Sequence, residues 1–168
     1  MKRAAVVVGL LMVWLVVNPG LWSQDKERAE LAKAVTEANV SLDQGLSASA
    51  REGEPISAKF EIEDGKLQLS VYTAKGGNFS EVVVDHKTGK AAKTEVITSG
   101  EDLSAARTQN EAMAKAKQSL HATLAKALQG NSGFRAVSIF PALKDGQPVA
   151  EITLTKGDEW KTVSEKLD

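Results

Sequence analysis

A pattern in the sequence recurs at a constant spacing of 81 residues. Residues 135–165 repeat residues 54–84 imperfectly, and every matching residue is displaced by that same number. The matches are Asp64-Gly65 with Asp145-Gly146, Lys75-Gly76 with Lys156-Gly157, Ser57 with Ser138, and Val82 with Val163. A constant offset is typical of one supersecondary unit that occurs twice in a chain. The repeat therefore predicts a protein that contains two tandem copies of one structural unit.

Each copy alternates apolar and polar residues between turn dipeptides, which is the pattern of half-buried antiparallel strands. In the first copy Ile56 and Phe60 lie on the apolar side, and Asp64-Gly65 predicts a tight hairpin turn. Pro141 and Pro148 cannot donate ladder hydrogen bonds, so they are expected at strand ends or sheet edges. The expected strands cover residues 56–62, 67–71, 79–85, 92–98, 134–141, 148–155 and 160–167.

A helix is expected ahead of each set of strands. The first covers residues 25–44 and stops at Gly45, because glycine is a common C-terminal cap. The second begins at Ser104 or at Thr108, where residues 108–111 fit a capping box, and ends at the glycines of residues 130–133. The apolar face of the first helix is expected to consist of Leu31, Val35, Ala38 and Leu42.

These elements predict an α+β fold with two repeats, each with one helix packed on a three- to four-stranded antiparallel β-meander. The expected boundaries are 24–98 for the first unit, 99–104 for a linker and 105–168 for the second unit. The second unit is truncated, because the chain stops where its fourth strand would come. Units of this size are marginally stable alone, so we expect them to pack together or to share one sheet.

Residues 1–23 have the order of a secretory signal peptide, with Lys2 and Arg3 ahead of an apolar run from Ala4 to Val17. The run has 14 residues, fewer than the ~20 that cross a bilayer as a helix. We expect cleavage after Ser23 and export to the periplasm or the medium. A retained N-terminal anchor and a buried core helix are the alternatives.

The composition argues against nucleic acid as a partner and excludes chemistry that needs cysteine. Removal of residues 1–23 leaves 19 basic residues against 22 acidic ones, and this balance offers no basic patch for nucleic acid. It also gives no reason to expect membrane binding apart from the N-terminal segment. The chain has no cysteine, so disulfides, thiolate metal sites and a cysteine nucleophile are impossible.

Three short motifs follow one another in the first copy. They are Asp64-Gly65, the aromatic-led strand from Phe79 to Asp85, and the turn Thr88-Gly89-Lys90. In these motifs residues 27–97 resemble the PepSY family, whose units combine a helix with antiparallel strands. Residues 106–168 match that layout but end before such a turn. The resemblance implies an exported bacterial protein with a non-catalytic role, such as inhibition or regulation of a protease, and it provides no catalytic residues.

The residue types that often act in catalysis, metal binding or recognition are spread along the sequence and form no cluster in it. His86 follows Asp85 directly, and neighbouring strand residues point to opposite faces, so His86 is expected to be a solvated turn residue. His121 is expected on a helix surface, and Glu61 and Glu63 on an ordinary solvated strand face. Tyr72, Phe79 and Trp160 form either an apolar recognition surface on one sheet face or core filling, and the 81-residue spacing of Phe79 and Trp160 favours a shared packing role.

The sequence therefore predicts no catalytic, cofactor-binding or metal-binding residues and no cofactor. The expected function is a non-catalytic exported binding or regulatory module with a protein or peptide partner, such as a peptidase. Recognition would use a sheet face or strand addition at a sheet edge. A small-ligand or metal-sensing periplasmic domain is the alternative, and an enzyme is not expected.

Overall fold

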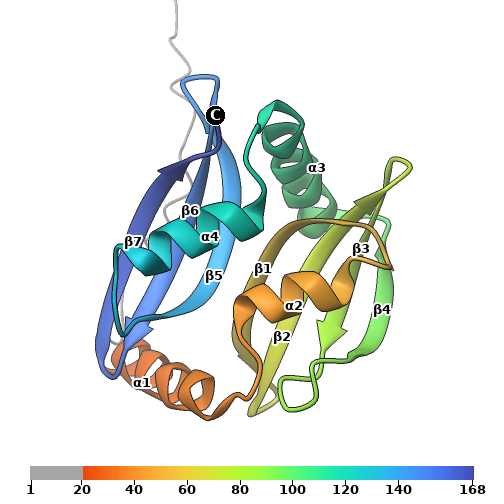
Figure 1. Cartoon of the computed structure of the whole chain (residues 1–168). Coiled ribbons are helices and arrows are strands. Elements are labelled where there is room, and N and C mark those ends of the chain that lie inside the picture. Colours follow the sequence, from red (N-terminus) through yellow and green to blue (C-terminus); the bar gives the residue numbers. More distant parts are fainter. Residues whose placement is uncertain (1–20) are drawn as a thin grey trace, which may run out of the picture.

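The computed structural model describes residues 21–168, and within that range the chain is α+β (Figure 1). Most of the predicted signal peptide lies outside the described residues, and residues 21–23 open the first helix. The helices are α1 (Leu21–Glu37), α2 (Leu42–Ser49), α3 (Gly100–Lys115) and α4 (Leu120–Gln129). The strands are β1 (Glu54–Glu63), β2 (Lys66–Lys75), β3 (Asn78–Val84), β4 (Ala91–Ile97), β5 (Arg135–Lys144), β6 (Gln147–Lys156) and β7 (Glu159–Lys166).

All of these strands form one antiparallel sheet in the order β4-β3-β2-β1-β5-β6-β7. The predicted antiparallel α+β class is confirmed, and the strands of both predicted units belong to the same sheet. β1 and β5 join the two meanders, and between them the described residues pair only as Ala58 with Ile139 and Lys59 with Ser138. We call this short contact the central seam.

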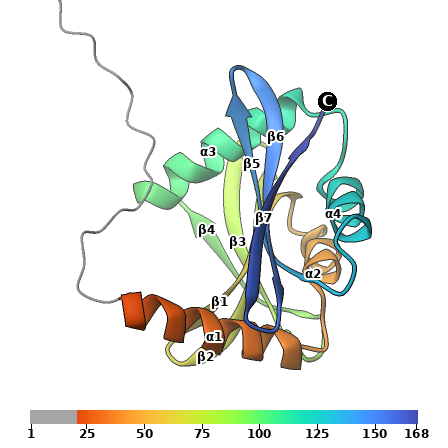
Figure 2. The same cartoon turned by 90° about the vertical axis from the view of Figure 1, so that its left-hand side faces the viewer.

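The helices divide the sheet into two unlike faces. α2 and α4 lie side by side on one face, which we call the covered face (Figure 1). On the other, open face, α3 lies across the upper part and α1 at the lower end (Figure 2). The open face is therefore bordered by two helices rather than sealed by them.

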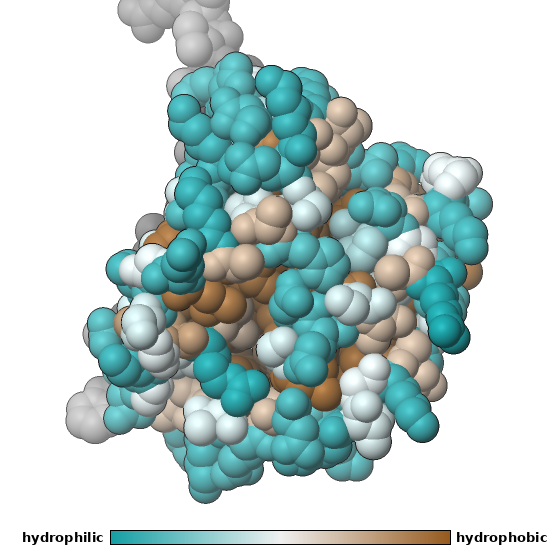
Figure 3. Space-filling view, in the orientation of Figure 1, coloured by the Kyte–Doolittle hydropathy of each residue, from teal (hydrophilic) through white to brown (hydrophobic). Residues whose placement is uncertain are grey.

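Most of the main core lies between the covered face and α2 and α4, and the same cluster extends to Val35 of α1. Leu46 of α2 and Leu124 of α4 are fully buried there, with β-strand residues from both meanders such as Val71 and Ile152. Figure 3 shows this side in space-filling form, with polar residues over most of it and apolar residues in its middle. One continuous cluster of buried side chains therefore spans both predicted units.

Two helices, not one, precede each set of strands, and the predicted single helices are wrong. Ser41 caps α2 with a capping box, in which its hydroxyl accepts from the Gln44 amide and the Gln44 side chain accepts from the Ser41 amide. Ser119 caps α4 in a similar way, because its hydroxyl accepts from the Ala122 amide. These caps begin new helices, so each continuous helix that the apolar spacing predicted is interrupted.

Other boundaries differ as well. Gly45 lies inside α2 rather than at a helix end. Residues 99–104 are not a linker, because Ser99 is the N-cap of α3 and the helix begins at Gly100. The predicted capping box at residues 108–111 is wrong for the same reason, and the Thr108 hydroxyl donates to the Ser104 carbonyl within the helix. The predicted end of the second helix is confirmed by Gly130 as its C-cap.

The hairpin turns form where the sequence places them. Asp64 and Asp145 have φ values of 49° and 51°, and a glycine with positive φ follows each. These are the backbone conformations that two-residue hairpins require, and aspartate and glycine tolerate them. Pro141 lies inside β5 rather than at its end, beyond the central seam, where β1 does not pair with it.

Each break between helices is held by the end of a strand. The His86 carbonyl, just after β3, accepts from the amides of Asn39 and Val40 at 3.0 and 3.1 Å. The Leu167 carbonyl, just after β7, accepts from the amides of Lys117 and Gln118 at 2.7 and 3.0 Å. Residues 86 and 167 are again 81 apart. The same backbone contact therefore occurs at both places.

Candidate functional site

Polar side chains line the middle of the open face, along β1, β2 and β3. They alternate with the buried residues of the covered face, because successive strand residues point to opposite sides. The strand register places Glu61 opposite Gln68, Lys59 opposite Ser70, and Tyr72 opposite Glu81. We call these residues the polar strip: Lys59, Glu61, Gln68, Ser70, Tyr72 and Glu81.

The members of the polar strip bond to one another. Lys59 Nζ lies 2.5 Å from Glu61 Oε2, and the Ser70 hydroxyl donates to Glu61 Oε1 at 3.1 Å. Gln68 Nε2 donates to the Ser70 hydroxyl at 3.0 Å and to Glu81 Oε1 at 3.5 Å. Lys59 Nζ also lies 5.9 Å from the centre of the Tyr72 ring, within range of a cation–π contact. The strip is one connected network.

The polar strip is half-buried, and the pKa values of Lys59 and Tyr72 are shifted. The side chains of Lys59 and Glu61 are 30% and 29% exposed. Burial lowers the pKa of Lys59, but its hydrogen bond to Glu61 and the charges nearby outweigh that effect and raise the pKa above its usual value. Burial raises the pKa of Tyr72 to about 12, with Glu81 and Glu61 adding to the effect and Lys59 opposing it. Both groups therefore keep their protons at neutral pH.

The shift of Tyr72 can be measured directly, because it is the single tyrosine of the chain. We expect tyrosinate absorbance to appear with a midpoint near pH 12 in the folded protein and near 10 after denaturation. Since the folded state holds this proton more tightly, the stabilisation is complete below the unfolded pKa and is lost as the pH rises through the folded pKa. Lys59→Met should move the folded midpoint higher still, whereas a folded midpoint near 10 would contradict the burial of this ring.

Three hollows border the polar strip, and one of them, of about 530 Å³, lies at Gln68. The other two lie at Lys59 and at Glu61. The smaller, about 140 Å³, lies beneath α3, and the larger, about 680 Å³, lies beside α1. Residues that line the smaller hollow include Lys59, Tyr72, Asp102, Gln109 and Phe140. Residues that line the larger one include Glu27, Arg28, Glu30, Leu31 and Glu61. Lys59 and Glu61, which pair with each other, each reach one of the hollows, so the strip connects the two.

The three aromatic residues that the sequence singled out all lie on the open face. Phe79 is 6% exposed and packs in a small cluster with Ile56 and Ala106 of α3. Trp160 packs partly buried against the main core, and the Arg28 guanidinium lies 5.9 Å from its ring centre. Phe79 pairs with Ala74, and Trp160 pairs with Thr155 at the positions 81 residues further on. Packing is therefore the role of these two, and Tyr72 belongs to the polar strip.

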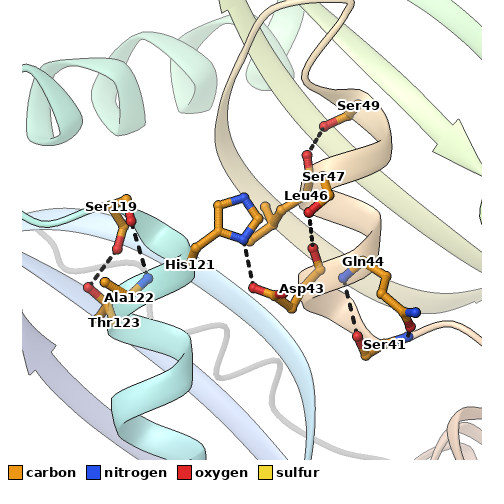
Figure 4. Close-up of polar contacts among 10 residues, drawn as sticks. All are labelled: Ser41, Asp43, Gln44, Leu46, Ser47, Ser49, Ser119, His121, Ala122 and Thr123. Carbon is orange, nitrogen blue, oxygen red and sulfur yellow. Dashed lines mark hydrogen bonds and ion pairs between the residues drawn. The ribbon is translucent and has the colours of Figure 1, made fainter.

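His121 has an acidic neighbour that the sequence did not predict. Its Nδ1 lies 2.6 Å from Asp43 Oδ1, so that a side chain of α4 meets one of α2 (Figure 4). Both side chains are substantially exposed, and an exposed pair of this kind contributes little to stability. The contact joins α2 to α4 at the surface of the covered face.

His86 is not the solvated residue that the sequence predicted. It is half-buried, and its Nδ1 is buried without a hydrogen-bond partner in the structure described for residues 21–168. Asp85 beside it accepts from the amides of Lys87 and Thr88, and these backbone hydrogen bonds hold the pKa of its carboxyl below the usual value. The Lys87 ammonium in turn donates to the Glu37 carbonyl at the end of α1. This turn thus ties β3 to α1.

Glu61 is also more enclosed than predicted, because the sequence placed it on a solvated face. Its partners come from another strand, and only the register of β1 and β2 brings them together. Among residues 21–168 no three His, Cys, Asp or Glu side chains are grouped closely enough to hold a metal ion. None of the helices in the described range is long and apolar enough to cross a membrane.

The structure thus defines an α+β protein with a polar strip on the less covered face of one antiparallel sheet. No protein-family model matches the sequence, and the search of curated proteins found no relative. One solved structure that resembles the chain is that of a putative lipoprotein from Clostridium difficile 630. The two share 11% sequence identity with a TM-score of 0.42, over 71% of this chain and 79% of the other.

Proposed function

We propose that this chain is an exported, non-catalytic binding module built from two PepSY-like units, and that it binds a protein or peptide partner on its open face. The partner class includes a peptidase whose activity the module regulates. Two helices and a three-stranded meander make up each proposed unit, and β4 is an addition to the first. The following observations support this proposal.

The duplication is supported by strand features that recur at the 81-residue offset found in the sequence, whereas the helix breaks that they meet lie 78 residues apart. The two Asp-Gly hairpins have matching positive φ values, and the carbonyls of residues 86 and 167 hold matching helix breaks. The sheet order is also symmetric about the central seam, with β1, β2 and β3 on one side and β5, β6 and β7 on the other. A duplicated unit gives all of these features at once.

The polar strip is the observation that carries the proposed binding function. A half-buried pair of opposite charges is weak evidence for stability, because its desolvation cost can exceed the attraction between the charges. Lys59 and Glu61 form such a pair on a sheet face where apolar residues could serve as well. Half-buried charges that a partner can desolvate further give specificity in recognition. We therefore assign the pair to partner selection rather than to folding.

The double variant Lys59→Met/Glu61→Gln tests this assignment. It removes both charges together, so no unpaired charge is left half-buried, and we expect the free energy of unfolding to change by less than about 1 kcal/mol. Tagged protein should capture a partner from envelope extract, and the double variant should lose at least about 10-fold of that affinity. Mass spectrometry identifies the partner, and the activity of a captured peptidase is then assayed with and without the module.

A matched control lies on the opposite side of the sheet. Lys126 of α4 pairs with Glu165 of β7 at 2.7 Å, and Lys126→Met/Glu165→Gln removes one charge of each sign there. This control should capture the partner as well as the unaltered protein does. If both double variants bind equally, the polar strip is not the recognition surface. If every captured protein is also retained by unrelated bait, the proposed binding function is wrong.

The alternative, a small-ligand or metal-sensing domain, makes a different prediction. Small-molecule sites usually have volumes of about 300–1,000 Å³, which the hollow beside α1 matches and the hollow beneath α3 does not. A panel of metals and metabolites screened by thermal unfolding would show saturable stabilisation by one compound if this alternative holds. We rank it second. In the described structure the larger hollow is lined by three glutamates and by one basic residue, Arg28, so its excess of negative charge does not favour an anionic metabolite.

A further inference from the structure

The edge strand β4 is open to another strand. Within residues 21–168 no strand pairs with its outer side, and six of its seven residues are exposed. Val96 is 65% exposed, which is unusual among the large apolar residues of the described structure. α2 covers β1, β2 and β3 but does not extend over β4 (Figure 1). An edge with free backbone N–H and C=O groups is a template for strand pairing.

The charges of β4 are arranged symmetrically. Lys93 and Glu95 lie on the open face on either side of Thr94, with Lys93 Nζ 2.8 Å from Glu95 Oε1. Their side chains are 62% and 57% exposed, and an ion pair this exposed contributes little to stability. Lys93 and Glu95 can therefore separate at little cost, and each can form an ion pair with a residue of another strand that pairs with β4.

We propose that a second copy of this chain pairs with β4 through an antiparallel contact between the two β4 strands, centred on Thr94. The two-fold axis of such a contact places Lys93 opposite Glu95 of the partner and Glu95 opposite Lys93 of the partner. It also covers the exposed Val96 with residues 91–92 of the partner. Directly opposite residues of unlike charge stabilise an antiparallel pair.

The charges select this register over its neighbours. A contact centred one residue earlier would place Lys93 opposite Lys93 of the partner. A contact centred one residue later would place Glu95 opposite Glu95 of the partner. Like charges directly opposite each other are destabilising, so Thr94 is the centre that the strand favours.

The other edge of the sheet is less suited to this pairing. On β7, Glu165 already pairs with Lys126 of α4, and Lys161 donates to the Asn131 side chain. These two charges contact groups elsewhere in the fold, whereas the ion pair of β4 in the described range joins Lys93 to Glu95 of the same strand. The dimer would continue one sheet through both copies and place the two polar strips on the same side. A partner with two matching segments would then bind with avidity.

Charge exchange tests the proposal with the full chain. Lys93→Glu leaves two acidic residues around Thr94, and Glu95→Lys leaves two basic ones. We expect sedimentation at low salt to show a dimer for the unaltered protein and at least about 10-fold weaker dimerisation for either variant alone. An equimolar mixture of the two variants should dimerise again, because each acidic position then faces a basic one. The double variant Lys93→Glu/Glu95→Lys should dimerise with itself for the same reason.

Each outcome bears on the proposal. Restored association in the mixture supports it and shows at the same time that both variants are folded. A protein that remains monomeric at millimolar concentration overturns it and leaves β4 as an edge for another protein's strand. A dimer that is equally stable in all four proteins overturns it too, because the contact then lies elsewhere.

Discussion

Replacement of Leu46 or Leu124 by alanine is expected to lower the free energy of unfolding by about 2–5 kcal/mol, the usual cost of a large-to-small change in a packed core. Both side chains are fully buried, and they seat α2 and α4 on the covered face of the sheet. Loss of the side chain removes buried apolar surface and leaves a cavity that the surrounding strands only partly fill. Denaturant unfolding measures the change.

The same pair of variants tests whether the two proposed units unfold together. In the chain from Gln24 onward Trp160 is the single tryptophan, and it lies on β7 in the second unit. Because the main core is continuous, Leu46→Ala in the first unit should shift the fluorescence transition of Trp160 as far as the circular dichroism transition. A shift in circular dichroism alone would mean that the units unfold independently. Val96→Ala serves as the control at protein concentrations where the chain is monomeric, since this side chain is 65% exposed there and little stability should be lost.

Gly45→Val is expected to cost about 1–3 kcal/mol, the usual penalty for overpacking a core. α2 approaches β2 so closely that a Cβ on Gly45 would lie 2.7 Å from Leu69 Cδ2, and Leu69 is fully buried. The larger side chain must displace either Leu69 or the helix. Thermal and denaturant unfolding measure the loss, and Leu69→Val in the same chain should recover part of it by making room.

Gly130→Ala is the matched control for the change at Gly45. Gly130 caps α4 with ordinary negative φ, and an added Cβ would meet nothing closer than 3.8 Å. This substitution should be neutral or slightly stabilising, because alanine loses less conformational freedom on folding than glycine. Equal stability of Gly45→Val and the unaltered protein would mean that α2 sits farther from the sheet than described.

The strands were predictable because their signals are local. Alternation in a stretch such as residues 56–62, followed by Asp64-Gly65, determines both a strand and its turn without information from the rest of the chain. The breaks between helices were missed although Ser41 and Gln44 formed a capping-box signature in the sequence. Leu42 continued the apolar spacing of the preceding helix, and that periodicity outweighed the cap in the prediction.

The polar strip could not be predicted, because it depends on contacts between residues distant in sequence. Glu61 meets Ser70 only through the register of β1 and β2, and Gln68 meets Glu81 only through that of β2 and β3. The contact of His121 with Asp43 joins residues from the two halves of the chain. Spacing along one element reveals which residues share a face, but it does not reveal which elements become neighbours.

The central seam has a mechanical consequence. The β1–β2 pair matches nine residue positions and the β5–β6 pair matches nine, whereas β1 and β5 match at two. Resistance to a pulling force rises with the number of backbone hydrogen bonds that must break at once. A load that draws the two halves apart would therefore act first on the central seam and on the shared core beneath it, before it breaks the longer strand pairings within each half.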